Sequence, residues 1–519
     1  MKKILVPVMI FILFSFTMSC DKKEKNTENS FRIISSFENK DLEYIFTDFA
    51  KQQKIDIKID YDDTINIASN ILNMKSANYD ACFLTNSIWF SLVNNKSLIK
   101  YSKPTSITPV VFGIKKTKAE ELDLISKDVY LKDIINIIKD NKLKFIIPSV
   151  TQTDSGASAY LSFLNSLSGN PEVLTMNNVK DENVKASMIS LFSGVERTSG
   201  STEYLSQMIQ DDNYNALIDY ESSIININKE LIENGKDPLY MLYPKDGVAL
   251  SDSPFAYIDN GDKKKEDVFN KLQSYLLSLE IQDKITSSGR RAGYGGLVDE
   301  NYSNIFNSDY GIKRDEYLNA IKYPNIDIIK EALNVYQFEF KKPTFTVFCL
   351  DFSGSMLEYG YDDLMNAMKL VLDEQEASNY FIQFSDQDKV ILIPFNNDVI
   401  SFYSGSTSEL LNDILNTTAG GGTNMYLALD KAIETVKNVD NDEYNVSIVL
   451  MTDGMSLEDD KSYVLNKYKN INKDIPIFSI LFGDADRSQL EEIATLSKAL
   501  VLDSKDDLIN AFKTIRAYN

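Results

Sequence analysis

The feature that most constrains the fold is a regular alternation of short apolar runs with helical stretches. Between residues 31 and 85 the apolar runs FRIIS, IDIKIDY and DACFLT are separated by segments with helical spacing. Strands that alternate with helices predict parallel sheets with helices on both faces. The sequence therefore predicts an α/β fold, and the same alternation continues with a strong amphipathic helix over residues 268–285.

The chain is too long for a single compact core, since its 519 residues predict two or three domains. The first alternation occupies residues 31–300. A second alternation begins at Thr344. Its strand candidates, such as TFTVFCL and NVSIVLM, are apolar at both odd and even positions, which is typical of strands buried on both faces. Residues 301–343 carry less strand signal, so we expect a helical linker there and a second domain over residues 344–519.

The N-terminus has the layout of a secretory signal. Two lysines precede an apolar run over residues 4–16 that is too short for a comfortable membrane span, so residues 1–19 are predicted to be a signal peptide. The following Cys20 resembles the lipidated first residue of a bacterial lipoprotein, although Thr17 stands where that signal usually has leucine. The resemblance implies an extracytoplasmic, membrane-anchored envelope lipoprotein with residues 20–30 as its lipid-bearing tether. An ordinary signal peptide with a chance cysteine is the alternative.

Composition disfavours several classes of function. The chain has no histidine, which removes Ser-His-Asp and Cys-His catalysis and histidine-ligated metals. Its net charge of −22 makes nucleic acid a poor partner. We therefore expect a protein that is not an enzyme. The remaining cysteines, Cys82 and Cys349, lie in apolar runs and are predicted to be buried free thiols.

Three loops of the second alternation carry oxygen-rich side chains after strand candidates. Asp351, Ser353 and Ser355 are spaced by two, which in an extended segment points them to one side. Thr423 follows three glycines, and Asp453 ends another apolar run. Because ligands bind outside the carboxyl ends of parallel strands, these side chains are expected to meet. Two carboxylates and three hydroxyls suit Mg²⁺, with Ca²⁺ or Mn²⁺ as alternatives.

These five positions, in this order, resemble the metal-ion-dependent adhesion site of the von Willebrand factor A domain. The resemblance runs from Thr344 to the C-terminus and implies a doubly wound fold whose metal bridges to an acidic residue of a partner protein. Asp, Ser and Thr also cap helices and close turns, so a fold of this kind without a bound metal is the alternative. A nucleophilic role for Ser353 or Ser355 is disfavoured, since the G-x-S-x-G turn and a base are both missing.

Residues 31–300 resemble extracytoplasmic solute-binding proteins of the two-lobed periplasmic type, in stretches such as YDACFLTNSIW and YPKDGVALSDSPFAY. The resemblance implies a cleft between two lobes. The cleft candidates are Ser35, Ser36, Asn86, Ser87, Thr153, Ser155, Ser158, Tyr220 and Glu221. Helix N-termini favour an anion whereas Glu221 favours a cation, so the charge of the solute stays open. Thr153, Asp154 and Ser155 suit helix capping as well as ligand contact, and Trp89 suits core packing better than stacking on a ligand.

Together these features predict a cell-envelope lipoprotein that binds a protein partner through a divalent metal and has a candidate cleft for a small solute. The alternative is the solute receptor of a transport system, in which the von Willebrand factor A domain is an accessory.

Overall fold

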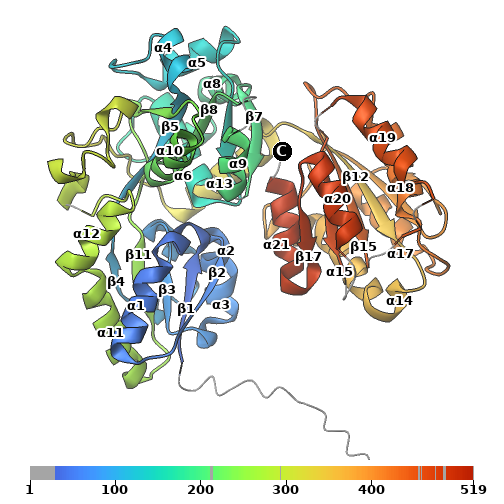
Figure 1. Cartoon of the computed structure of the whole chain (residues 1–519), viewed down its shortest axis with the longest axis horizontal. Helices are drawn as coiled ribbons and strands as arrows, with labels where there is room; N and C mark the ends of the chain where they lie inside the picture. The colour runs from blue at the N-terminus through green and yellow to red at the C-terminus, as the bar shows by residue number, and fades with distance from the viewer. Residues whose placement is uncertain are drawn as a thin grey trace, which may run out of the picture.

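The computed structural model describes residues 30–519 apart from 201, 211–213, 293, 454–455, 458, 474, 483–486 and 518–519. The predicted signal peptide, Cys20 and nearly all of the predicted tether lie outside the described residues. Figure 1 shows three α/β bodies, each built around its own sheet. The first two are the lobes of the N-terminal module, and the third follows them along the chain.

The sheet of the first lobe has the strand order β2-β1-β3-β11-β4. In that order the strands span Ile57–Asp62, Phe31–Ser36, Ala81–Phe83, Pro254–Ile258 and Ile99–Pro104. One face packs on α1 (Glu43–Gln53), α11 (Lys263–Leu276) and α12 (Leu279–Ser287). The other face packs on the short helical segments over residues 64–74. Ile33 and Ile34 of β1 point to opposite faces, so this strand is buried on both sides.

The sheet of the second lobe has the order β10-β5-β8-β6-β7, with β9 paired to β5. In that order the strands span Leu250–Ser251, Thr108–Lys115, Ala216–Tyr220, Phe145–Pro148, Val195–Ser199 and, for β9, Leu239–Leu242. Its helices are α4 (Lys116–Glu121), α5 (Leu131–Lys139), α6 (Asp154–Leu167), α7 (Met176–Val179), α8 (Glu182–Phe192), α9 (Thr202–Gln210) and α10 (Glu221–Glu233). The chain passes between the lobes from β4 to β5 and again from β10 to β11.

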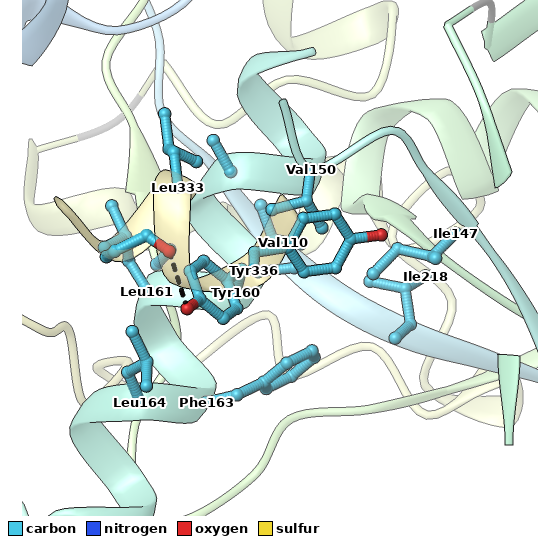
Figure 2. Close-up of a cluster of buried hydrophobic side chains, with 14 of the residues drawn as sticks. Val110, Ile147, Val150, Tyr160, Leu161, Phe163, Leu164, Ile218, Leu333 and Tyr336 are labelled. Atoms are coloured by element: carbon cyan, nitrogen blue, oxygen red, sulfur yellow. Dashed lines mark hydrogen bonds between the residues drawn. The ribbon is translucent and has the colours of Figure 1, made fainter. Parts of the chain in front are cut away.

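Part of the predicted linker folds onto the second lobe. It forms α13 (Ile326–Val335), which continues into a π-helical turn, η10 (Tyr336–Phe340). Figure 2 shows Leu333 and Tyr336 of this segment beside Tyr160 of α6. The Tyr160 hydroxyl donates a hydrogen bond to the carbonyl of Ala332 at 2.8 Å (Figure 2). These residues therefore complete the hydrophobic core of the second lobe.

The third sheet has the order β14-β13-β12-β15-β16-β17. In that order the strands span Tyr403–Ser404, Lys389–Phe395, Thr344–Asp351, Asn445–Thr452, Ile477–Leu481 and Val501–Asp503. α18 (Met425–Val436), α19 (Lys461–Ile471) and α20 (Ser488–Ser497) cover one face, and α15 (Tyr361–Leu372), α17 (Thr407–Leu415) and α21 (Ser504–Ala517) cover the other. From β12 the chain continues to β13 on one side and later to β15 on the other. The predicted doubly wound α/β fold is confirmed.

Two features of the N-terminal module differ from the sequence prediction. In the first lobe β1, β2 and β3 are parallel as expected, but β11 pairs antiparallel with both β3 and β4. This strand returns from the second lobe, so its direction follows from a connection that local patterns do not reveal. The predicted helix over residues 268–285 is two helices, because Ser278 adopts extended angles (φ −71°, ψ 151°) as the N-cap of α12.

The third body packs directly on the second lobe. Gln152 Nε2 donates to the carbonyl oxygens of Tyr380 at 2.9 Å and Phe381 at 3.3 Å. Thr198 Oγ1 donates to the carbonyl of Ala517 in α21. One hydrophobic cluster also runs from strands of the second lobe into α15 and α21. The two bodies therefore share apolar packing as well as the connecting segment.

Cys82 and Cys349 are both buried and unpaired, as predicted. Burial raises the pKa of each thiol above its ordinary value. The Cys349 thiol lies against the carbonyl of Ala428, with a sulfur–oxygen distance of 3.6 Å. These thiols act as small apolar side chains of the two sheets.

Candidate functional site

The strand order of the third sheet reverses at β12, where β12 and β15 lie side by side. Asp351 is the last residue of β12, and Thr452 is the last residue of β15. Thr452 Oγ1 donates to Asp351 Oδ2 at 2.6 Å, and the backbone N–H of Ser353 donates to Oδ1 at 2.8 Å. In doubly wound sheets ligands bind at this switch point, so the carboxylate stands where a ligand is expected.

Backbone hydrogen bonds join the three predicted loops. The N–H of Gly354 donates to the carbonyl of Gly421 at 2.9 Å, which ties the first loop to the glycine loop. The carbonyl of Thr423 accepts from the N–H of Leu457 at 3.2 Å, which ties the glycine loop to the third loop. Gly421 has φ of +89°, and an added Cβ would meet Asn397 Oδ1 at 2.6 Å. Asn397 can move aside, so it is the positive φ that favours glycine at this turn.

The five candidate ligands differ in how far they are exposed to solvent. Asp351 and Ser353 are buried, Thr423 and Asp453 are half-buried, and Ser355 is exposed. The hydroxyls of Ser353 and Ser355 lie 3.1 Å apart. The set therefore has an inner carboxylate and an outer edge that a macromolecule can reach.

The charge of Asp351 is poorly compensated by the protein. Burial raises the pKa of Asp351 to about 6, and the neighbouring Asp453 carboxylate adds to the rise. The hydrogen bonds from Thr452 and Ser353 oppose it. A divalent cation would supply the missing positive charge, and the oxygen-only donors suit a hard cation such as Mg²⁺. Over the described ranges, no group of three or more Asp, Glu, Cys or His side chains is arranged to hold a metal. A metal here would therefore depend on hydroxyl and water ligands beside the two carboxylates.

The junction between the first two lobes is crossed by a chain of polar contacts. Ser36 Oγ is hydrogen-bonded to Thr64 Oγ1, which lies 2.8 Å from Thr85 Oγ1. Ser251 Oγ donates to the carbonyl of Thr85 at 2.6 Å and to Asp154 Oδ2 at 3.1 Å. The chain therefore joins the end of β1 to the start of α6.

Asp154 is the centre of this junction and is fully buried. Its carboxylate accepts hydrogen bonds from Trp89 Nε1 at 2.5 Å, from Ser158 Oγ at 3.2 Å and from the Tyr220 hydroxyl. Trp89 is itself buried, as core packing requires. Of the cleft candidates, Ser36, Ser158 and Tyr220 are therefore brought into one network.

Other cleft candidates hold the backbone. Thr153 Oγ1 caps α6 by accepting from the N–H of Gly156 at 3.1 Å. Ser35 Oγ faces backbone carbonyls, the nearer at 3.3 Å. Asn86 Nδ2 donates to the carbonyl of Leu250 and to the Tyr323 hydroxyl. Asn86 and Ser87 also line a surface groove of about 570 Å³, together with apolar side chains of the same loop.

Glu221, the one charged cleft candidate, is engaged in an ion pair. Arg291 Nε and Nη2 donate to its two carboxylate oxygens, both at 2.7 Å, and neither side chain is exposed. The Tyr243 hydroxyl donates to the same carboxylate. This arrangement compensates the charge of Glu221 within the protein.

Residues 346–514 match the von Willebrand factor type A domain family, and residues 38–291 match the family described as bacterial extracellular solute-binding protein. The chain joins a bacterial extracellular solute-binding domain to a von Willebrand factor type A domain. The matched solute-binding family is an extracellular one. Within the part of the chain that the structure describes, no helix has both the length and the apolarity needed to cross a membrane.

Individual relatives are distant. The human inter-alpha-trypsin inhibitor heavy chain H2 is 29% identical over 163 residues, which is 29% of this chain and 17% of that protein. An ABC transporter protein from Clostridium perfringens is 13% identical, covers 59% of this chain and 97% of its own, and has a TM-score of 0.43. Maltose-bound MalE3 of T. maritima is 10% identical, covers 59% of this chain and 93% of its own, and has a TM-score of 0.45. This chain thus spans about 17% of the length of the curated relative it matches.

Sequence reasoning missed functional groups in both domains. In the von Willebrand factor A domain, Thr452 directly contacts Asp351, and its place at the end of an apolar run beside Asp453 was the available signal. In the solute-binding domain, Asp154 was considered only as a helix cap, although it is the centre of the hydrogen bonds at the lobe junction. No local pattern marks this carboxyl, because its partners Trp89, Tyr220 and Ser251 come from distant parts of the chain.

Proposed function

We propose that this chain is an envelope lipoprotein whose von Willebrand factor A domain binds a protein partner through a divalent metal. Its solute-binding domain would carry a small solute, and Cys20 would anchor the chain to the membrane. The proposed metal ligands are Asp351, Ser353, Ser355, Thr423 and Asp453.

The observation that carries the proposal is the buried carboxylate of Asp351 at the switch point of the sheet. The Asp351 carboxylate accepts two hydrogen bonds, and burial and the charge of Asp453 raise its pKa. The exposed Ser355 lies at the outer edge of the same site. A bound Mg²⁺ would act as a Lewis acid that accepts a carboxylate from the partner. Backbone hydrogen bonds fix the three loops of the site, and the exposed Ser355 leaves its outer edge accessible to a partner.

The test compares capture of a partner from envelope extract by the full-length protein in Mg²⁺ and in EDTA. Capture is expected in Mg²⁺ only, and it should be lost in Asp351→Ala, since the inner ligand is removed. Asp386→Ala is the matched control, because Asp386 is exposed and lies just before β13, at the opposite edge of the same sheet. Capture that is equal in Asp351→Ala and the control would contradict the proposal.

A receptor role in a transport system is the second candidate function. The polar network that joins the two lobes through Asp154 favours it, because a solute bound between lobes would couple to their closure. In this case the solute, and not a metal-bound partner, would determine what the protein delivers. Solute binding that persists in Asp351→Ala while no partner is captured would favour this candidate.

A further inference from the structure

One tyrosine of the linker, Tyr323, reaches into the junction between the two lobes. Its hydroxyl accepts a hydrogen bond from Asn86 Nδ2 of the first lobe at 2.9 Å. In the second lobe, the same hydroxyl lies 2.8 Å from Ser158 Oγ of α6 and donates to the carbonyl of Leu250 in β10 at 3.2 Å. A single side chain from the linker therefore bonds to both lobes.

The linker is fixed on both sides of this tyrosine. Before it, the N–H of Val248 donates to the carbonyl of Asn319 at 2.9 Å, and the N–H of Ile321 donates to the carbonyl of Val248 at 3.0 Å. After it, the side chain of Asn325 caps α13 by accepting from two backbone N–H groups. α13 in turn packs on the core of the second lobe. Tyr323 is therefore positioned by backbone pairing on one side and by a capped, packed helix on the other.

The chemistry of a phenol suits this bridging position. A neutral phenol hydroxyl donates one hydrogen bond and also accepts, so it can serve an amide, a hydroxyl and a carbonyl at once. Burial raises the pKa of Tyr323 above its ordinary value, and the charge of Asp154 adds to the rise. The hydroxyl therefore keeps its proton, and with it the bond to the Leu250 carbonyl.

The partners of Tyr323 are groups that the sequence predicts to line the solute cleft. Asn86 and Ser158 are both cleft candidates, and Ser158 Oγ also donates to Asp154 at the centre of the lobe junction. Asn86 and Tyr323 both line the surface groove of about 570 Å³, so a dissolved molecule can reach this contact. The chain's own phenol thus occupies polar groups that a solute between the lobes would otherwise use.

We infer that Tyr323 is a built-in latch of the solute-binding domain, whose phenol holds the lobes together and must leave Asn86 and Ser158 before a solute can use them. The part of this inference that concerns a solute rests on the proposed solute-binding role, and none of it depends on the metal site. Because the linker leads through α13 to the von Willebrand factor A domain, opening of the lobes is coupled to the segment that joins the two domains.

The test compares the full-length protein with Tyr323→Phe, which keeps the aromatic ring and removes only the hydroxyl. Acrylamide quenching of Trp89 reports lobe opening, because this residue is the one tryptophan of the chain, is buried and lies in the same short helical segment that Asn86 caps. Amide hydrogen exchange of residues 84–93 and 319–325 reports the two ends of the contact. We expect exchange in both segments to rise by about tenfold in Tyr323→Phe, together with the quenching of Trp89, because a hydroxyl that bonds to both lobes is lost.

Tyr317→Phe is the matched control, because Tyr317 belongs to the same linker and is 71% exposed. If Tyr323→Phe does not fold, Ser158→Ala removes the partner of the latch on α6 and becomes the test variant. Exchange and quenching that are equal in the test variant and the control would overturn the latch. An increase in exchange that is as large in β5 and β8 as at the junction would also overturn it, since Tyr323 would then stabilise the whole second lobe and not the contact between lobes. These readouts need neither a solute nor a metal, so the latch can fail while the proposed function stands, and partner capture in Mg²⁺ tests that function separately.

Discussion

The buried ion pair between Arg291 and Glu221 offers a sharp test of how the solute-binding domain is held together. The guanidinium donates to both carboxylate oxygens at 2.7 Å and to the carbonyls of Gly296 and Lys313 at 2.8 Å. Neither side chain of the pair is exposed to solvent. Arg291→Met keeps an apolar stem of similar length but leaves the Glu221 carboxylate buried without its cation.

The expected loss of stability follows from that burial. Removing one partner of a buried ion pair destabilises by about 3–5 kcal/mol, because the remaining charge is desolvated and uncompensated. For a domain of this size, 1 kcal/mol corresponds to roughly 2–4 °C of melting temperature. We therefore expect the transition of the solute-binding domain to fall by about 6–20 °C. Adding Glu221→Gln to Arg291→Met should restore part of the loss, since no buried charge is left unpaired.

Tryptophan fluorescence during urea unfolding is a suitable assay, because the chain has one tryptophan, Trp89, and it is buried in the solute-binding domain. Arg314→Met is the matched control, since its partner Glu300 is 78% exposed and such pairs contribute about 0–1 kcal/mol. A loss below about 1 kcal/mol for Arg291→Met, equal to that of the control, would refute the reasoning. Glu221 would then be available to a solute, as the sequence alone predicts.

Two further predictions concern metal and pH. Mg²⁺ at about 100 times its dissociation constant should stabilise the von Willebrand factor A domain by about 2.7 kcal/mol in calorimetry, and Asp351→Ala should abolish the shift. The raised pKa values of Glu38, about 8, and Asp219, about 7, mean that the folded state holds these protons more tightly than the unfolded state. The stability that these two groups contribute should therefore be fully present below their ordinary pKa values of 4.5 and 3.8, and it should be lost as pH rises through about 7 to about 8. Burial and the charges of Asp63, Asp154 and Asp219 raise the pKa of Glu38, so Glu38→Gln should flatten this slope, and an unchanged slope would contradict the assignment.

Local patterns predicted most of the elements but not all of their partners. The strand runs of the third sheet were recognisable because they are apolar at both odd and even positions, and helices such as α18, α19 and α20 alternate with them as the pattern predicts. The antiparallel pairing of β11 was missed, because β11 returns to the first sheet only after the second lobe has been built. The break between α11 and α12 was missed as well, since the apolar period continues through Ser278 while the backbone does not.

The candidate sites divide in the same way. Asp351, Ser353, Ser355 and Asp453 lie at or just after the ends of β12 and β15, and a parallel sheet brings neighbouring strand ends to one edge. Thr423 differs from the prediction, because its loop joins the helices α17 and α18 and does not leave a strand. The positions of the first four could therefore be predicted from spacing, and backbone hydrogen bonds tie the loop of Thr423 to the other two. Glu221 followed a strand end too, but its pairing with Arg291 depends on a segment that lies far along the chain. A strand-end rule identifies a position and not the partner that reaches it.

By itself, the sequence determined the α/β fold, the order of the two domains and the oxygen-rich loops, because each depends on periodicity or spacing within a short segment. The tertiary structure decided which charges are compensated. Glu38 and Asp219 lie in different lobes, and only the packing of these lobes lets the charge of Asp219 raise the pKa of Glu38. Lys513 comes near Asp63 only because the von Willebrand factor A domain packs against the solute-binding domain. Charge compensation is a property of distances in space, and spacing along a chain does not encode it.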